Sequence, residues 1–206
     1  MKLALTDITD QQAIPPEYAF GIIDPESHIK LGANRNPGVS WENLPEGTRS
    51  LVIICVDVDV PTVPDNVNKE GLTVPSGLLR TDFYHWVMVD IPPAINGIAK
   101  GACSDGVTAG GKQNPQGPGR QGINDYTGWF ANDADMKGEY YGYDGPCPPW
   151  NDELVHNYHF VLYATDLESC PVEGAFTGID VEHAIAGHIL DEVRVTATYT
   201  LNPDLA

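Results

Sequence analysis

Several polar side chains lie within or beside three apolar stretches of the sequence. The packing of a buried strand does not require polar residues at these positions. The apolar runs cover residues 50–57, 83–91 and 158–164, and the polar residues within or beside them are Asp57, Asp59, His85, His156 and Tyr158. Because side chains alternate along a strand, His156 and Tyr158 share one face. We therefore expect these groups to converge on one cleft.

Two imidazoles, a carboxylate and a phenol in one cleft predict anion binding. Protonated histidines donate hydrogen bonds, and a nearby aspartate orients an imidazole and keeps it charged. The alternative is that each group only forms an interior hydrogen bond. Asp57, His85 and His156 could also serve as acid and base in a weak hydrolase, but no nucleophile accompanies them. We expect a binding module and not an enzyme.

Other signatures of chemistry are incomplete. The residues around Lys112 lack the GxxxxGK[ST] spacing of a nucleotide-binding loop. The sequence has neither GxSxG nor HExxH, and His183 and His188 are five positions apart, on different faces of a helix. The acidic loop that begins at Asp133 resembles a calcium loop, yet Lys137 occupies a ligand position. We therefore expect no metal and no cofactor.

The elements that must position the cleft are mainly strands. The runs 50–57, 83–91 and 158–164 are rich in β-branched and aromatic residues, and residues 193–201 alternate between apolar and polar. One helix is predicted, from Asp180 as N-cap to Ile189. Residues 61–81 and 102–150 are dense in Gly, Pro, Asn and Asp, and such long loops are often binding surfaces. The pattern indicates a single mainly β domain, 1–206.

Charge and composition exclude several partners. The chain has 206 residues, 29 acidic and 11 basic, and the net charge of −18 opposes binding to nucleic acid or an anionic membrane. No signal-peptide pattern and no apolar stretch of 18 residues is seen, so we expect a cytoplasmic protein without membrane insertion. The four cysteines form no CxxC pair. One disulfide among Cys103, Cys147 and Cys170 is left open.

Several short motifs together resemble one known family. They are NPGVSW at 36–41, LPEGT at 44–48, DVDVP at 57–61, HW at 85–86, IP at 91–92, GPCPP at 145–149 and HNYHF at 156–160. In order and separation they resemble the phosphatidylethanolamine-binding protein family, over about residues 18–201. Within it, the chain is most similar to the bacterial and archaeal branch, the Raf-kinase-inhibitor-like proteins.

The resemblance implies a fold and a site. The fold is a two-sheet antiparallel β-sandwich with a Greek-key element, long loops and a few peripheral helices. The site is a small surface pocket for phosphate-like or carboxylate anions. Carried over by position, its ligand-binding residues are Asp57, His85, Gly145, Pro146, His156 and Tyr158, with Asp59, Pro61 and Trp86 in support. The resemblance also implies a cis peptide bond at Val60–Pro61.

The chain departs from the family pattern at several positions. Val58 replaces a proline between the two aspartates, Val60 replaces a small residue, and Asn157 replaces the arginine of an HRY motif. We expect the last change to act on structure and not on the ligand, because Asn157 points away from His156 along the strand. The loops 62–81 and 129–141 are longer than is typical, and we expect them to cover the pocket or to form a partner interface.

The expected partner is a small anion such as phosphate, phosphoethanolamine or a carboxylate. The resemblance implies an alternative, a regulatory inhibitor of a protein kinase or serine protease that acts through the pocket rim and the long loops. This alternative is based on analogy between folds. A homodimer through exposed strand edges is left open.

Overall fold

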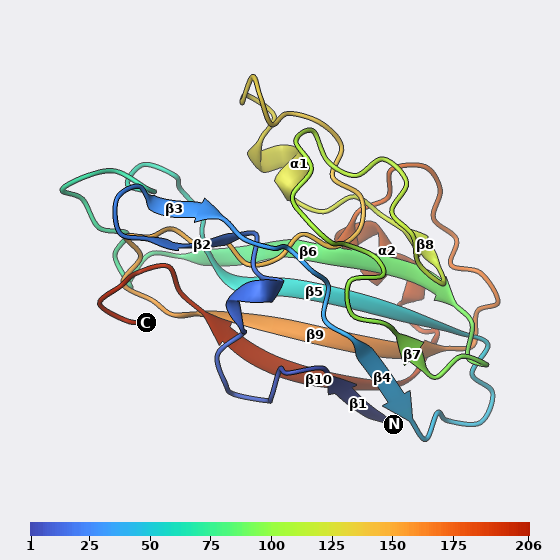
Figure 1. Ribbon diagram of the computed structural model, residues 1–206. Helices are drawn as coiled ribbons and strands as arrows, with labels where there is room; N and C mark the ends of the chain where they lie inside the picture. The colour runs from blue at the N-terminus through green and yellow to red at the C-terminus, as the bar shows by residue number, and fades with distance from the viewer.

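A five-stranded antiparallel sheet runs through the centre of the molecule, in the spatial order β10-β9-β5-β6-β8 (Figure 1). The computed structural model describes all residues, 1–206. The strands are β5 (Ser50–Pro61), β6 (Arg80–Ile91), β8 (Arg120–Gln121), β9 (His156–Thr165) and β10 (Ile189–Tyr199). Since β9 returns to pair with β5 after β6 and β8, the order β9-β5-β6-β8 is that of a Greek key.

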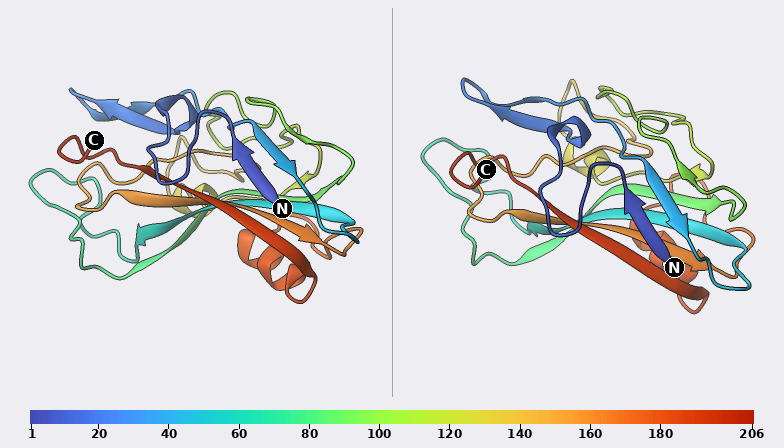
Figure 2. Two further views of the ribbon diagram at one scale, coloured as in Figure 1. Left: turned by 90° about the horizontal axis from the view of Figure 1, so that it is seen from below. Right: turned by 60° about the horizontal axis from the view of Figure 1, so that its bottom comes forward.

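A smaller sheet covers one face of the central sheet, and a helix covers the other (Figure 2). The smaller sheet has the order β1-β4-β7 and consists of β1 (Lys2–Leu5), β4 (Val39–Glu42) and β7 (Gly97–Ile98). The helix is α2 (Gly178–Ile185). The remaining elements are η1 (Pro16–Tyr18), the hairpin β2 (Gly21–Asp24) and β3 (His28–Leu31), and α1 (Tyr126–Trp129). The expected mainly β, antiparallel architecture is confirmed.

The central strand β5 is apolar on both faces because both faces are covered. Leu51, Ile53 and Cys55 belong to the core beneath the smaller sheet, whereas Val52 and Ile54 belong to the core beneath α2. This explains why the sequence of β5 reads as a continuous apolar run. The strand ends at Asp57 in the sequence prediction, but in the structure it continues to Pro61.

The helix α2 begins and ends earlier than predicted. Thr177 is the N-cap, and its hydroxyl accepts a hydrogen bond from the Asp180 backbone. The Asp180 carboxylate accepts in return from the Thr177 backbone, so Asp180 is the third residue of a capping box and not the cap itself. The helix ends at Ile185, because Ala186 leaves the helical path with a ψ of 123°. Gly187 follows with a positive φ of 83° in a turn that the His188 N–H closes on the carbonyl of Ile185, before β10 begins at Ile189.

The cis peptide bond expected at Val60–Pro61 is wrong, because all peptide bonds of the structure are trans. Val60 pairs with Thr81 and Pro61 pairs with Arg80, so the extended trans chain continues the ladder between β5 and β6. All four cysteine thiols are free. None of the helices combines the length and the hydrophobicity that a membrane-spanning helix requires.

Candidate functional site

A cavity of about 420 Å³ opens where β5, β6 and β9 carry the predicted polar residues. Its lining includes the predicted ligand residues Asp57, His85 and His156, together with Pro61. Asp57 pairs with Phe83 on β6 and with Tyr158 on β9, so the sheet register places the three strands' polar residues side by side. Antiparallel pairing therefore assembles the site from segments about 100 positions apart.

A β-bulge aims His85 into the cavity. Cys55 pairs with Trp86 but Val56 pairs with Tyr84, so β6 has one residue more than β5 at this point. His85 and Trp86 consequently face the same side of the sheet, His85 toward the cavity and Trp86 toward the core. Bulges commonly re-aim side chains beside functional sites.

His156 is held between two carboxylates. Its Nδ1 lies 2.8 Å from Oδ2 of Asp57, and its Nε2 lies 3.1 Å from Oδ2 of Asp152. All three side chains are almost fully buried. Burial lowers the pKa of His156, but the charges and hydrogen bonds of Asp57 and Asp152 outweigh it and raise the pKa to about 9. At neutral pH the ring is therefore an imidazolium that donates from both nitrogens.

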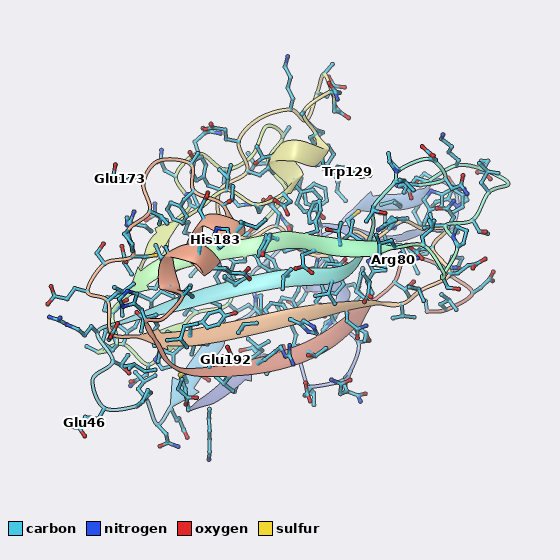
Figure 3. The ribbon with its side chains drawn as sticks, turned by 180° about the vertical axis from the view of Figure 1, so that it is seen from behind. Glu46, Arg80, Trp129, Glu173, His183 and Glu192 are labelled. Carbon is cyan, nitrogen blue, oxygen red and sulfur yellow. The ribbon has the colours of Figure 1, made fainter.

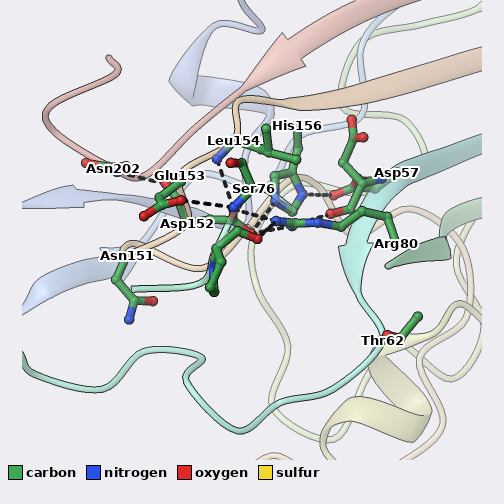
Figure 4. A network of polar contacts seen from close by, with 12 residues as sticks. Asp57, Thr62, Ser76, Arg80, Asn151, Asp152, Glu153, Leu154, His156 and Asn202 are labelled. Carbon is green, nitrogen blue, oxygen red and sulfur yellow. Dashed lines mark hydrogen bonds and ion pairs between the residues drawn. The ribbon is translucent and has the colours of Figure 1, made fainter. Parts of the chain in front are cut away.

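Arg80 completes a row of alternating charges, Arg80, Asp152, His156 and Asp57 (Figure 4). Nη1 and Nη2 of Arg80 reach the two Asp152 oxygens at 2.6 and 3.0 Å, a bidentate ion pair. Burial raises the pKa of Asp152, but the hydrogen bonds from His156 and Arg80 prevail and lower it. The four formal charges sum to zero, so the row adds no net charge to the site.

Sequence reasoning missed both Arg80 and Asp152. The only signal was the spacing of Asp152 and His156, four positions apart. Arg80 lies at the far end of a long loop, and nothing in its local sequence connects it with Asp152.

His85 is neutral and has a fixed tautomer. Its Nδ1 lies 2.8 Å from the carbonyl oxygen of Asp144, and the Asp144 backbone N–H donates to the carbonyl of His85. Because a carbonyl only accepts, Nδ1 carries the proton and Nε2 of the neutral ring is an acceptor. Burial lowers the pKa of His85 and outweighs the opposing charge of Asp57. No other protein group bonds to Nε2, and the ring lines the cavity.

Asp144 anchors the segment that holds His85. Its buried carboxylate accepts hydrogen bonds from Nζ of Lys112 at 2.7 Å, Nδ2 of Asn34 at 2.7 Å and Nδ2 of Asn124 at 2.9 Å. This residue falls at the last position of the calcium-like loop that begins at Asp133. In the structure, the Asp133 carboxylate accepts instead from the backbone of its own loop.

Three predicted ligand residues lie behind the cavity wall. Tyr158 is buried, its ring packs 5.3 Å from the His85 ring, and its hydroxyl has no hydrogen-bond partner. The Gly145 N–H donates to Oδ1 of Asn34, and the Pro146 carbonyl accepts from two backbone N–H groups. Their role as ligand residues stays a prediction. The next three residues, Cys147, Pro148 and Pro149, do line the cavity.

The predicted supporting residues occupy structural positions. The Asp59 carboxylate accepts from the backbone and side-chain nitrogens of Asn157, at 2.7 and 2.8 Å. Asn157 thus ties β9 to the end of β5 and lies outside the cavity lining, as expected for a structural effect. Trp86 is fully buried and donates from Nε1 to Gln121. Pro61 is the one supporting residue that lines the cavity.

Two long loops form the walls. The first is loop 62–79, which connects β5 with β6 and contributes Thr62, Pro64, Val67 and Asn68 to the lining. The second contains α1, and it contributes Tyr126, Trp129 and Phe130. Figure 3 labels Arg80 at the beginning of β6 and Trp129 at the end of α1, two elements at the border of the site. Both long loops, which we expected to cover the pocket or to form a partner interface, therefore contribute to the cavity lining, and a partner interface stays a prediction.

Comparison with known proteins agrees with this fold. The family model described as phosphatidylethanolamine-binding protein matches residues 5–200. A UPF0098 protein of Methanothermobacter thermautotrophicus is 30% identical over 97% of this chain and 98% of its own length. The Escherichia coli UPF0098 protein YbhB is 26% identical over 97% of this chain and all of its own length.

Two solved structures share the fold. The Chlamydia trachomatis protein CT736, described as a homologue of phosphatidylethanolamine-binding proteins, has a TM-score of 0.64 and 24% identity over 96% of both chains. E. coli YbcL, described as a member of the mammalian family, has a TM-score of 0.66 and 22% identity over 97% of both chains. Because the family model matches almost the full length of the chain, the chain belongs to the phosphatidylethanolamine-binding protein family.

Proposed function

We propose that the protein binds small anions that carry a phosphoryl or carboxylate group, as in phosphate, phosphoethanolamine or a carboxylic acid. The observation that carries this proposal is the meeting of Asp57, His85 and His156 in one cavity of about 420 Å³. A buried cluster of titratable groups in a cavity is a typical mark of a binding site. Gly145, Pro146 and Tyr158 remain predicted ligand residues, although they lie outside the cavity lining.

The two histidines have different parts in this proposal. Both nitrogens of His156 are taken by Asp57 and Asp152, so His156 contributes charge but no free donor. His85 has a free Nε2, which accepts while the ring is neutral and donates once it is protonated. An anion in the cavity raises the pKa of His85 by Coulomb attraction, and so binding takes up a proton. Affinity for the anion therefore increases as pH falls.

The affinity is modest on this view. A charge-assisted hydrogen bond contributes about 1.5 to 3 kcal/mol. Among the charged side chains of the lining, only His85 has a nitrogen free for such a bond, and association has its own entropic cost. We therefore expect dissociation constants from micromolar to millimolar, typical of a headgroup or small metabolite and not of tight lipid storage.

Binding without turnover is the proposed activity. Cys147 is the one thiol in the cavity lining, and burial raises its pKa to about 12. It is therefore a thiol and not a thiolate at neutral pH, which makes it a poor nucleophile. We place this activity in the cytoplasm because the four cysteines are free, as is usual in a reducing compartment.

The proposal is tested by calorimetric titration with phosphate, phosphoethanolamine and acetate near pH 6 and pH 8. Acetate keeps the same charge at both pH values, so its pH dependence reports on the protein. We expect binding that strengthens toward pH 6 and disappears in His85→Ala. His183→Ala is the matched control because His183 is exposed on α2, on the other side of the sheet (Figure 3).

Two results would contradict the proposal. One is equal binding of acetate by wild type and His85→Ala, because the anion would then lie elsewhere. The other is steady hydrolysis of phenyl phosphate that His85→Ala abolishes, which would make the site a hydrolase.

A second candidate function is inhibition of a protein kinase or serine protease, supported by exposed apolar side chains on loop 62–79. Val63, Leu72 and Leu79 are 42%, 46% and 76% exposed, beside the cavity residues of the same loop. Such side chains are typical of a surface covered by a partner. Leu72→Ser combined with Leu79→Ser would weaken inhibition in a kinase and protease panel but leave acetate binding unchanged.

A further inference from the structure

The cavity is larger and more apolar than a small inorganic anion requires. A volume of about 420 Å³ lies in the range of pockets that enclose a whole organic ligand. The titratable side chains Asp57, His85 and His156 occupy only one part of the lining, and Thr62 and Asn68 are its other polar residues. Most of the remainder is apolar, and its large side chains are Val60, Val67, Phe83, Tyr126, Trp129 and Phe130.

One wall is a rigid aromatic platform. The rings of Tyr126 and Phe130 stack at 5.6 Å with 13° between their planes, and Phe20 stacks on Tyr126 from 4.5 Å. The Tyr126 hydroxyl donates to the carbonyl of Gly145, and this bond holds the platform to the GPCPP segment. Beside these rings, Trp129 remains 48% exposed although it lines the cavity. An aromatic ring that is left half open can stack on a ligand.

The other wall is a loop fastened from within. Asn151 is 6% exposed, and its Nδ2 donates to the carbonyls of Asn66 and Leu72 at 2.9 and 2.8 Å. Its Oδ1 accepts from the backbone N–H of Asn68, 3.0 Å away. Arg80, itself anchored on Asp152, donates to the carbonyl of Pro75. The loop is therefore ordered before a ligand arrives, and it presents Pro64 and Val67 to the cavity.

The charges of the lining leave room for only one charged group on the ligand. No lysine and no arginine lines the cavity, and its charged side chains are limited to Asp57 and the histidines. A second anionic group placed between the aromatic wall and loop 62–79 would find no cation. A single anionic head at His85 with an uncharged apolar body matches this distribution.

We propose that the site selects an organic anion with one phosphoryl or carboxylate head and a flat ring as its body, held between Trp129 and loop 62–79. This inference rests on the proposed anion binding at His85 and adds the chemical class of the ligand. Trp129 and Val67 are then specificity-determining residues, and Asn151 is a positioning residue that acts through the loop.

The test compares three phosphate monoesters with the same head: methyl, n-hexyl and phenyl phosphate, titrated by calorimetry near pH 6. We expect phenyl phosphate to bind about tenfold more tightly than methyl phosphate, because stacking and burial of the ring add to the head. In Trp129→Ala the ratio of the two affinities, phenyl phosphate over methyl phosphate, should fall to about two or less. Trp129→Phe should restore most of this ratio. Leu79→Ala is the control, because Leu79 is exposed on the same loop but does not line the cavity.

The outcomes separate this inference from the proposed function. Equal affinities for methyl and phenyl phosphate, both lost in His85→Ala, would overturn the ring selectivity and leave anion binding intact. Hexyl phosphate that binds as tightly as phenyl phosphate would also overturn it, and would point to an alkyl chain such as that of a lipid. Failure of all three esters, phosphate and acetate to bind would remove the anion site itself, and the present inference with it.

Discussion

Asp152 bonds the Nε2 side of the His156 ring from four positions earlier in the chain, with 3.1 Å between Nε2 and Oδ2. This pair lies in the interior, and it converts His156 from a ligand donor into a fixed cation. The free imidazole nitrogen of the site therefore belongs to His85 alone. His156 therefore contributes a positive charge and stabilises the structure, whereas His85 is the histidine that contacts the ligand in the proposed function.

The first prediction concerns Asp152→Asn. The substitution removes the negative charge between Arg80 and His156 and leaves two buried cations facing each other. Breaking one partner of a buried ion pair costs about 3 to 5 kcal/mol. We expect the free energy of unfolding in urea to fall by roughly that amount. Asp166→Asn is the control, because its contact with His188 is half exposed, and we expect a change below about 1 kcal/mol.

The second prediction concerns alkaline pH. The pKa of His156 is raised from 6.5 to about 9 in the folded protein, so this group stabilises the fold fully below its unfolded pKa. The contribution is lost as pH rises through about 9. A shift of this size corresponds to roughly 3 kcal/mol. We expect the free energy of unfolding to fall between about pH 7 and pH 10.

The variant His156→Gln checks the assignment. It should be less stable than wild type at neutral pH and should lose most of the alkaline dependence, whereas His188→Gln should keep it. An unchanged alkaline slope in His156→Gln would show that another group is responsible. At acidic pH the sign is reversed: the pKa of Asp152 is lowered, so its contribution is lost as pH falls.

Much of this architecture could be predicted from the sequence because the relevant signals are local. The runs of β5, β6 and β9 and the alternation in β10 were visible, and Asp57, His85 and His156 stood out as polar residues beside buried strands. The family motifs added the expected two-sheet fold.

The rest depends on contacts between distant segments. Arg80 meets Asp152 across 72 positions, and Asn151 reaches the carbonyls of a loop 79 to 85 positions away. Neither residue has a local pattern that indicates such a partner. The tautomer of His85 is likewise fixed by the backbone of Asp144, and a backbone contact leaves no trace in side-chain types.

The third prediction concerns Lys112→Met, which keeps an unbranched chain of four heavy atoms but removes the ammonium group. The Asp144 carboxylate would keep two amide donors but lose its only cation, at full burial. We expect a loss of about 3 kcal/mol in the free energy of unfolding. Because Asp144 fixes the His85 ring, acetate should also bind more weakly. Lys137→Met, in the exposed acidic loop, should change neither quantity.

The fourth prediction concerns Gly145, where a side chain has no room. A Cβ atom at this position would overlap the carbonyl oxygen of Tyr18, so the backbone must move. Gly145→Ala should therefore destabilise the fold by about 2 kcal/mol or more. Gly77→Ala is the matched control, since nothing lies within 4 Å of its Cβ position. Equal stability of the two variants in urea would contradict this prediction, because it would show that the backbone of the GPCPP segment shifts at little cost in free energy.

The fifth prediction concerns the fastening of loop 62–79 by Asn151. Replacement by alanine leaves the carbonyls of Asn66 and Leu72 and the N–H of Asn68 without their partner. The loop should then open more often, and limited proteolysis within residues 62–79 should be several-fold faster, since cleavage follows the population of the open form. Asn202→Ala is the control, because Asn202 donates to Asp152 and makes no bond to the loop. A loop that resists protease equally in both variants would mean that Arg80 and the bridge between Val74 and Asp152 suffice to hold it.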